Sequence, residues 1–356
     1  MKFTFILPGF IKIPMGGVKV VNEYANRLAE RGNEVTLVYP LTLRTGNWGY
    51  ALRKKISALI DRIQRVSESL YYTPNPAVNV MVVRSATSKY IPNGDAIIAI
   101  GWQTAEAVAE LPPEHGRKFY LLQSFETYFS QKKRILATYH LPLQKIAVAS
   151  WIINEINQLG EKCFGPLGNA INPTEFFIEN PQLERCNDVL MVYHPHKIKG
   201  AQEGLAALQI IKKRWPTLTA TIVAPRKPVH RIPSWIKVII RPPISDLRHL
   251  YNTSKIFLHS SRWEGWPLPP LEAMACGCAV VATANRGVQE YLVDQENALL
   301  CPINDVQALA QNVITLLESD QLREKLANSG LKTIQCYNWT ECTSRLEQYL
   351  TEQKTE

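Results

Sequence analysis

A chain of 356 residues exceeds the usual size of one hydrophobic core, so two domains of ordinary size are expected. Hydrophobic residues make up 46% of the sequence and charged residues 20%, a balance that is typical of globular proteins and argues against disorder. The 40 Lys and Arg outnumber the 31 Asp and Glu to give a net charge of +9, which favours anionic partners such as phosphates, nucleic acids or an acidic membrane face. No stretch approaches the roughly 18 apolar residues of a spanning helix, so a transmembrane class is excluded.

The N-terminal part alternates short apolar runs with stretches of helical periodicity. The run "KFTFILP" predicts a buried strand rather than a signal peptide, because Pro8, Gly9 and Lys12 interrupt it and no small-residue cleavage site follows. The next stretch, which ends at Gly32, predicts a helix from its apolar spacing; the apolar residues are Val20, Val21, Tyr24, Ala25 and Leu28. Further strands are expected at "NEVTLVYP", "VNVMVVR", "AIIAI", "FYLLQ" and "KIAVAS". Strands this apolar are typical of a buried parallel sheet, and the alternation indicates a doubly wound α/β domain.

Residues 52–66 interrupt this alternation with a basic amphipathic stretch. An apolar stripe at helical spacing runs beside several basic residues; the apolar ones are Leu52, Ile56, Leu59, Ile60, Ile63 and Val66, and the basic ones Arg53, Lys54, Lys55, Arg62 and Arg65. A helix of this kind lies on an anionic membrane surface or packs on its own domain. The sequence leaves both interpretations open.

A stretch rich in Pro, Asn and Gly at 165–188 is the best candidate for a linker between domains. A second alternating series follows it, with strands expected at "VLMVYH", "TATIVAP", "KVIIRP", "KIFLHSS", "AVVAT" and "ALLCPI", and three closing helices between residues 306 and 349. The chain is therefore expected to form two doubly wound domains, at residues 1–170 and 171–339. Ligands in such folds bind beyond the carboxyl ends of the strands, so a cleft between two facing domains is the expected site.

Two loops between strand and helix could hold an anion. Gly16 and Gly17 precede the first helix, where glycines let the backbone approach a phosphate or a developing negative charge; a tight turn that needs positive φ explains them equally well. The pattern is neither GxGxxG nor a Walker loop, which argues against dinucleotide oxidoreduction and NTP hydrolysis. In "VYHPHKIKG", Lys197 and Lys199 stand at a strand end, where a lysine reaches an anion or is simply solvated.

The sequence offers little support for a metal or a disulfide framework. His194 and His196 could supply two zinc ligands, but no second pair at metal spacing follows them. The seven cysteines include no CxxC, so reduced and mostly buried thiols of a cytoplasmic protein are expected.

Two glutamates flank the start of a helix in "SSRWEGWPLPPLEAMACGCAVVAT". Glu264 follows the strand "KIFLHSS", and Glu272 lies about one turn into a helix that has prolines in its first turn and Gly277 after its end. Carboxylates so placed can accept hydrogen bonds from several sugar hydroxyls, and the N–H groups between them suit a diphosphate. A coincidental pair, with one carboxylate capping the helix and the other solvated, is the alternative that the spacing alone favours.

The whole segment resembles the signature of the retaining glycosyltransferases of family four, which have the GT-B fold. The resemblance includes a Glu-Gly-aromatic-Pro-Leu-Pro run and a second Glu followed by Ala-Met-Ala-Cys-Gly. It extends to Gly16-Gly17, to "SWIINEI", to "GVQEYLVDQENALLCPINDVQALAQNV" and to "YNWT". The last of these enters a helix that, in GT-B proteins, crosses back to the N-terminal domain, here at about 340–356.

The resemblance implies a role for each matching position. Lys199, Glu264 and Gly17 would serve catalysis, Lys199 by neutralising the diphosphate leaving group and Glu264 by contacting the donor sugar. Glu272 would hold the ribose hydroxyls. The full set implied to bind the donor is Gly16, Gly17, His194, Lys199, Arg226, Arg262, Glu264, Gly265, Trp266, Pro267, Leu268 and Glu272.

The chain departs from the family at two places. His194 stands where the family carries an arginine, so either this histidine is protonated or another cation replaces it, with Arg226, Lys227 and Arg262 as candidates. Where many members have a histidine near the donor sugar, this chain has Gln123 and Glu126, which are expected to face the acceptor. That variant resembles rhamnosyl and related glycan-assembly transferases.

The expected function is metal-independent and cofactor-free transfer of a hexose, with retention, from a nucleoside diphosphate sugar to a glycan or lipid-linked acceptor. Two alternatives stay open: another GT-B activity such as a sugar-nucleotide epimerase, and a catalytically degenerate protein that binds sugar nucleotides. Nucleic acid is not expected as a partner, because no basic stripe with interleaved aromatics is present. The expected location is cytoplasmic, at the inner face of the membrane if residues 52–66 dock there.

Overall fold

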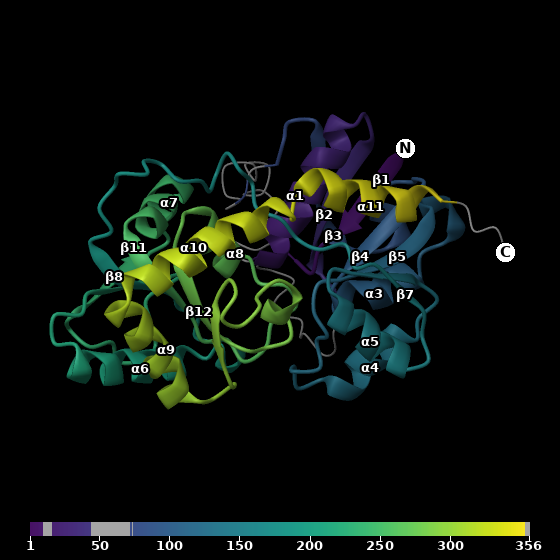
Figure 1. Cartoon of the computed structure of the whole chain (residues 1–356). Coiled ribbons are helices and arrows are strands. Elements are labelled where there is room, and N and C mark those ends of the chain that lie inside the picture. The colour runs from purple at the N-terminus through teal and green to yellow at the C-terminus, as the bar shows by residue number, and fades with distance from the viewer. Residues whose placement is uncertain (10–15, 44–71, 73, 353–356) are drawn as a thin grey trace. The chain divides into compact units, whose positions relative to one another are not determined.

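The computed structural model describes residues 1–9, 16–43, 72 and 74–352. These residues form two compact units, one of Met1–Gly168 with Trp339–Glu356 and the other of Asn169–Asn338 (Figure 1). The amphipathic stretch predicted at 52–66 lies outside the described residues.

The first unit contains a seven-stranded sheet in the order β3-β2-β1-β4-β5-β6-β7. Every neighbouring pair is parallel. The strands are β1 (Lys2–Ile6), β2 (Glu34–Thr42), β3 (Val78–Ser85), β4 (Ala96–Ile100), β5 (Arg117–Leu122), β6 (Gln144–Ala147) and β7 (Cys163–Phe164). All residues of β4 are buried, as expected for a strand covered on both faces.

Helices and short 3-10 turns connect these strands; they are α1 (Gly16–Glu30), η2 (Ser88–Tyr90), α3 (Trp102–Ala109), η3 (Pro113–His115), α4 (Lys132–Tyr139), α5 (Ser150–Gln158) and α11 (Trp339–Thr351). The predicted apolar face of α1 is confirmed, because its five apolar residues are all buried. The last helix, α11, packs on α1, where the rings of Tyr24 and Trp339 meet edge to face at 5.2 Å. The C-terminal helix is therefore part of the first unit.

The second unit contains a six-stranded parallel sheet in the order β10-β9-β8-β11-β12-β13. Its strands are β8 (Asn187–Val192), β9 (Ala220–Ala224), β10 (Ile236–Ile240), β11 (Ser254–His259), β12 (Ala279–Thr283) and β13 (Leu299–Cys301). Its helices and turns are η4 (Lys197–Lys199), α6 (Ala201–Arg214), α7 (Ile244–Asn252), α8 (Pro269–Ala275), η5 (Val288–Glu290), α9 (Val306–Glu318) and α10 (Asp320–Gln335). Two doubly wound parallel sheets confirm the predicted fold class.

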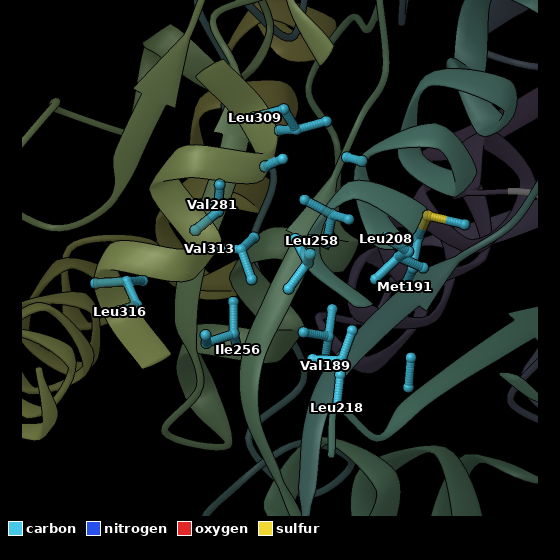
Figure 2. Packing of buried hydrophobic residues seen from close by; sticks show 14 of the residues in the cluster. Val189, Met191, Leu208, Leu218, Ile256, Leu258, Val281, Leu309, Val313 and Leu316 are labelled. Carbon is cyan, nitrogen blue, oxygen red and sulfur yellow. The ribbon is translucent and has the colours of Figure 1, made fainter. Parts of the chain in front are cut away.

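Side-chain alternation divides the second sheet into two covered faces. Every second residue of the central strands points toward α6 and α9, as Val189, Ile256, Leu258 and Val281 do in Figure 2. The intervening residues face the other side, where Phe257 of β11 meets Tyr251 of α7 with ring centroids 5.6 Å apart. Because both faces are buried, the polar side chains of this unit's core gather at the strand ends.

Each sheet has one point at which the strand order reverses, between β1 and β4 in the first unit and between β8 and β11 in the second. Loops that leave the carboxyl ends of such a pair diverge to opposite faces, and this divergence leaves a binding crevice. The segments singled out in the sequence follow these strands: Gly16–Gly17 comes after β1, Lys199 after β8 and Glu264 after β11.

Candidate functional site

The loops that follow β8 and β11 are bound to each other by backbone contacts. The carbonyl of Ile198, in η4, accepts hydrogen bonds from the N–H groups of Arg262 at 2.7 Å and Trp263 at 3.2 Å. Gly200 has a φ of +60°, and a Cβ at this position would lie 1.8 Å from the carbonyl oxygen of Ser260. Only glycine permits this approach, which brings η4 against the end of β11.

The approach places Lys199 and Glu264 in a close ion pair. The Lys199 ammonium donates to both carboxylate oxygens of Glu264, with Nζ to Oε1 at 2.8 Å and Nζ to Oε2 at 2.7 Å. The side chain of Glu264 is only 11% exposed. Burial acts to raise the pKa of Glu264, but the Lys199 charge outweighs it, helped by His259 and a hydrogen bond from Ser261, and the net pKa lies below the ordinary value. Glu264 is therefore an ionised carboxylate in a largely dry position.

His194, which lies in the loop between β8 and η4, is uncharged at neutral pH. Burial, followed by the positive charges of Lys199, His196 and Arg226, lowers its pKa to about 4. Its Nδ1 accepts the backbone N–H of His196 at 3.2 Å, which leaves the ring proton on Nε2. Of the two alternatives that the sequence left open, the structure favours a cation other than His194.

Two of the three candidate cations differ sharply in their surroundings. Arg262 forms a salt bridge with Glu203 of α6, so its charge is already compensated. Arg226 is exposed at the end of β9, and its charge acts on His194. Within the described residues Arg226 pairs with no carboxylate. Arg226 is therefore an available cation, and its charge reaches His194.

Glu272 lies in the first turn of α8 and is 7% exposed. Pro269 occupies the first helical position, where a missing N–H costs no hydrogen bond, and Gly277 follows the helix with a φ of +76°. The Tyr251 hydroxyl donates to Glu272 Oε2 at 3.2 Å. These features confirm the predicted helix and place the second glutamate on it as a buried acceptor.

The residues between the two glutamates are buried and are held by aromatic side chains. Trp266 is 8% exposed and contacts Tyr291 and Tyr337, with ring centroids 5.6 and 5.4 Å away. The Tyr291 hydroxyl donates to the carbonyl of Pro267 at 2.7 Å. Gly265 and Leu268 are buried as well. The Trp266 side chain thus packs into the second unit. This leaves the backbone of the neighbouring loop residues to contact a ligand.

In the first unit, Gly17 and Gln123 are brought together at the carboxyl edge of the sheet. Gln123 follows β5, and its Nε2 donates to the Gly17 carbonyl at 3.0 Å. A Cβ on Gly17 would lie 3.0 Å from Gln123 Oε1, whereas a Cβ on Gly16 would meet nothing within 4 Å. Neither glycine has positive φ. The tight-turn explanation of this pair is therefore wrong, and a side chain at Gly17 would crowd the Gln123 amide.

Glu126, near Gln123 in the chain, is a partly buried carboxyl group with uncharged partners. Its Oε2 accepts the N–H of Trp102, the first residue of α3, at 2.9 Å and the hydroxyl of Tyr120 at 3.2 Å. Burial raises the pKa of Glu126 to about 7, although both hydrogen bonds act to lower it. Both protonation states of this carboxyl group are therefore accessible near neutral pH.

Known proteins resemble this chain in sequence and in fold. Residues 177–333 match the family described as glycosyl transferases group 1. This part of the chain, which makes up most of the second unit, is similar to the group 1 glycosyltransferases. The match covers every residue of the second unit singled out above, from His194 to Glu272.

The similar proteins are glycosyltransferases that match only part of the chain in sequence. Over 111 residues the chain is 33% identical to O-antigen chain mannosyltransferase B of Escherichia coli, covering 31% of this chain and 29% of that relative. The first curated relatives are matched over 29% to 48% of their own lengths.

Solved structures match the chain over nearly its whole length. Sucrose-phosphate synthase from Thermosynechococcus elongatus has a TM-score of 0.72 and 15% identity, covering 98% of both chains. HepE of Anabaena, solved in complex with UDP-glucose, has a TM-score of 0.71 and 17% identity, covering 99% of both chains. At these identities the likeness shows the fold, which is GT-B.

Two residues near Glu264 in the second unit were not predicted from the sequence. His259, the last residue of β11, lies 3.9 Å from Glu264. Asn285 donates to the carbonyl of Ser261 at 3.0 Å and accepts the N–H of Gly287 at 3.1 Å, which fixes the segment beneath Glu264. The strand end "FLH" was the only signal for His259, and nothing local distinguishes Asn285 from any loop asparagine.

Three further observations concern the described part of the chain alone. None of its helices is long and apolar enough to cross a membrane. No group of three or more His, Cys, Asp or Glu side chains in it is arranged to hold a metal ion. All seven cysteines are free, and four of them are buried.

Proposed function

We propose that the protein is a glycosyltransferase that transfers a hexose from a nucleoside diphosphate sugar to a glycan or lipid-linked acceptor, with retention of anomeric configuration and without a metal ion. The observation that carries the proposal is the ion pair of Lys199 and Glu264 above the reversal point of the second sheet, with Glu272 buried on the helix that follows. HepE of Anabaena, which shares the fold, was solved with UDP-glucose, and the E. coli relative is named as an O-antigen chain mannosyltransferase.

The charges at this edge suit a departing diphosphate. Lys199 ends the turn that leads directly into the 14 residues of α6, so its ammonium and the positive end of that helix act on the same region. Arg226 adds an exposed cation nearby. Fixed positive charge that meets the negative charge developing on the leaving group lowers the activation barrier, and here it takes the role that a metal ion plays elsewhere.

The carboxylates suit the hydroxyls of the donor. An ionised carboxylate offers acceptors in several directions, so Glu272 can hold two ribose hydroxyls while Tyr251 keeps its other oxygen oriented. Glu264 is positioned in the same way for the transferred sugar, with Lys199 fixing its rotamer. In the first unit, Gln123 and Glu126 offer an amide and a proton-exchanging carboxyl group to the acceptor.

Donor identity and reaction type can be tested together. A thermal-shift screen against common nucleoside diphosphate sugars should identify one donor that raises the melting temperature, because a ligand bound to the native state stabilises it. Incubation with that donor and a glycan acceptor, followed by NMR of the product, should show the anomeric configuration of the donor retained. Transfer should persist in EDTA. An epimerised donor formed without acceptor, or binding without any turnover, would contradict the proposal.

Variants of two lysines in one turn separate catalysis from surface charge. Lys199→Ala should lower kcat about 100-fold or more, because it removes the charge that stabilises the leaving group. Lys197→Ala, an exposed neighbour, is the matched control and should retain nearly full activity. Glu272→Ala should act mainly on the KM for the donor, raising it about tenfold or more. Equal kinetics of the Lys199 and Lys197 variants would remove Lys199 from the site.

Arg226 and Lys227 form a second matched pair for the missing family arginine. Both are exposed after β9. Arg226→Ala should weaken binding of the nucleoside diphosphate by about tenfold and reduce its salt dependence, whereas Lys227→Ala should change little. Isothermal titration calorimetry at two salt concentrations measures both effects.

The acceptor's location stays a prediction from the sequence. If residues 52–66 dock on a membrane, the protein should sediment with vesicles containing anionic lipid, and replacing the basic residues of that stretch should abolish sedimentation. Sedimentation that ignores lipid charge would contradict membrane docking and leave the transfer reaction untouched.

A further inference from the structure

His259 is a buried polar side chain that the proposed reaction does not yet use. It ends β11, is 7% exposed and stacks on Phe257 with ring centroids 6.3 Å apart. Its Nε2 is buried and has no hydrogen-bond partner among the described residues. A buried polar atom left without a partner destabilises a fold, so its retention calls for a functional explanation.

The atom that Nε2 faces is a carboxylate oxygen of the site. Nε2 lies 3.9 Å from Glu264 Oε1, about 1 Å beyond hydrogen-bond length. The charged groups that act on the ring are Glu264 and Lys199. Burial lowers the pKa of His259 to about 4, so the ring is neutral and carries one N–H. Opposite a carboxylate that proton is favoured on Nε2, because a nitrogen lone pair there would be repelled.

The Lys199 ammonium group cannot donate fully to both Glu264 and a departing diphosphate. An ammonium group has three N–H donors, and the two oxygens of Glu264 already engage two of them at 2.7 and 2.8 Å. As negative charge develops on a departing diphosphate, Lys199 is drawn toward it and its hold on Glu264 weakens. A buried carboxylate that loses its cation needs another donor.

We infer that His259 is a positioning residue for Glu264, whose Nε2–H bonds to Oε1 when Lys199 turns toward the leaving group. A movement of about 1 Å closes the bond. His259 thereby keeps Glu264 ionised and oriented at the moment when its partner is shared. This inference rests on the proposed transfer reaction and adds a residue to it.

Three substitutions at this one position test the inference. Glutamine places an amide N–H₂ near the position of Nε2, asparagine places one near Nδ1, and leucine has no donor. We expect His259→Leu and His259→Asn to lower kcat about 10- to 100-fold, the loss of one hydrogen bond to a charged group, with the KM for the donor within about threefold. His259→Gln should keep kcat within about threefold of the unsubstituted protein.

Two further readouts separate positioning from a purely structural role. Because leucine removes an unpartnered buried polar atom, His259→Leu should keep or raise the melting temperature while kcat falls. The acid limb of its kcat profile should move to higher pH, because Glu264 loses one of the groups that lower its pKa. A melting temperature that falls with kcat in the leucine variant and recovers with it in the glutamine variant would show a structural role and overturn the inference.

The remaining outcomes are also decisive. If the unsubstituted protein transfers no sugar with any donor, the proposed function fails. If it transfers sugar and the leucine variant is equally fast, the inference about His259 fails and the proposed function stands. Equal activity of the asparagine and glutamine variants would also overturn it, because only one of them places a donor at Nε2.

Discussion

Each unit carries a glutamate side chain at the edge of its parallel sheet where the strands end. The pKa values of these two carboxyl groups are shifted in opposite directions. Glu264 follows β11, pairs with Lys199 and has a lowered pKa. Glu126 follows β5, accepts from the uncharged Trp102 N–H and Tyr120 hydroxyl, and has a pKa raised to about 7. Burial acts to raise both values, so the cation decides the difference.

This contrast shows how one topology supports two kinds of chemistry. At the second edge the ionised carboxylate and its cations suit an anionic donor whose hydroxyls must be held. At the first edge the carboxyl group has uncharged partners, and its pKa is raised to about 7. The residue type is the same, and the partner supplied by a neighbouring loop sets its role.

The largest expected effect comes from removing the cation. Lys199→Met should lower the free energy of unfolding by about 3 kcal/mol, because it leaves Glu264 buried and unpaired. Urea denaturation measures this change. The double variant Lys199→Met with Glu264→Gln should recover most of the loss, since no charge remains to be compensated. A double variant as unstable as the single one would show that the pair contributes by packing and not by charge.

The next effect is a pH dependence that Glu126 alone should produce. Its native pKa of about 7 lies above its ordinary value, so the native state binds more protons than the unfolded state in the window between them. The contribution of Glu126 to stability is therefore present at low pH and is lost as pH rises to about 7, a change on the order of 2 kcal/mol.

Glu126→Gln, which does not titrate, is the test of that dependence. Denaturation at several pH values should show the stability of the variant falling less, or rising more, between about pH 4.5 and 7 than that of the unsubstituted protein. The slope contributed by Glu264 has the opposite sign, because a lowered pKa makes stability fall as pH falls. An unchanged profile in the glutamine variant would place the protonation change elsewhere.

The smallest expected effect distinguishes the two glycines of α1. Gly16→Ala should stabilise the protein by about 0.5 kcal/mol, because Ala favours the helix and its Cβ meets open space. Gly17→Ala should gain less or lose stability, since its Cβ presses on the Gln123 amide at 3.0 Å. Thermal unfolding of the two variants side by side measures the difference. Equal stabilisation would show that Gln123 moves freely, and the first edge would then be less preorganised than the second.

Much of the second edge could be predicted because the relevant information is local. The apolar run of β11, the prolines of α8 and Gly277 are neighbours in sequence, and they place Glu264 at a strand end and Glu272 in a first helical turn. The alternation of apolar strands and amphipathic helices likewise predicted two doubly wound sheets. Strand and helix periodicities are properties of short segments, so they can be recognised directly in the sequence.

The partners of the site residues could not be predicted, because they come from distant parts of the chain. Lys199 and Glu264 are 65 positions apart, and Arg262 and Glu203 are 59 apart. Sequence reasoning treated Arg262 as a candidate phosphate cation, and only the fold shows that Glu203 already compensates it. The pKa values follow from these same contacts, so they were equally out of reach.

The sequence by itself determined the fold class, the positions of the two glutamates on loop and helix, and the resemblance of the second unit to a glycosyltransferase family. Only the tertiary structure decided which carboxyl group is ionised, that His194 is neutral, and that His259 stands beside Glu264. The physical reason is the close packing of η4 against β11, where Gly200 leaves just enough room for the backbone of Ser260. Hydrophobic periodicity is a local property of the sequence, whereas charge compensation depends on contacts between segments that only folding brings together.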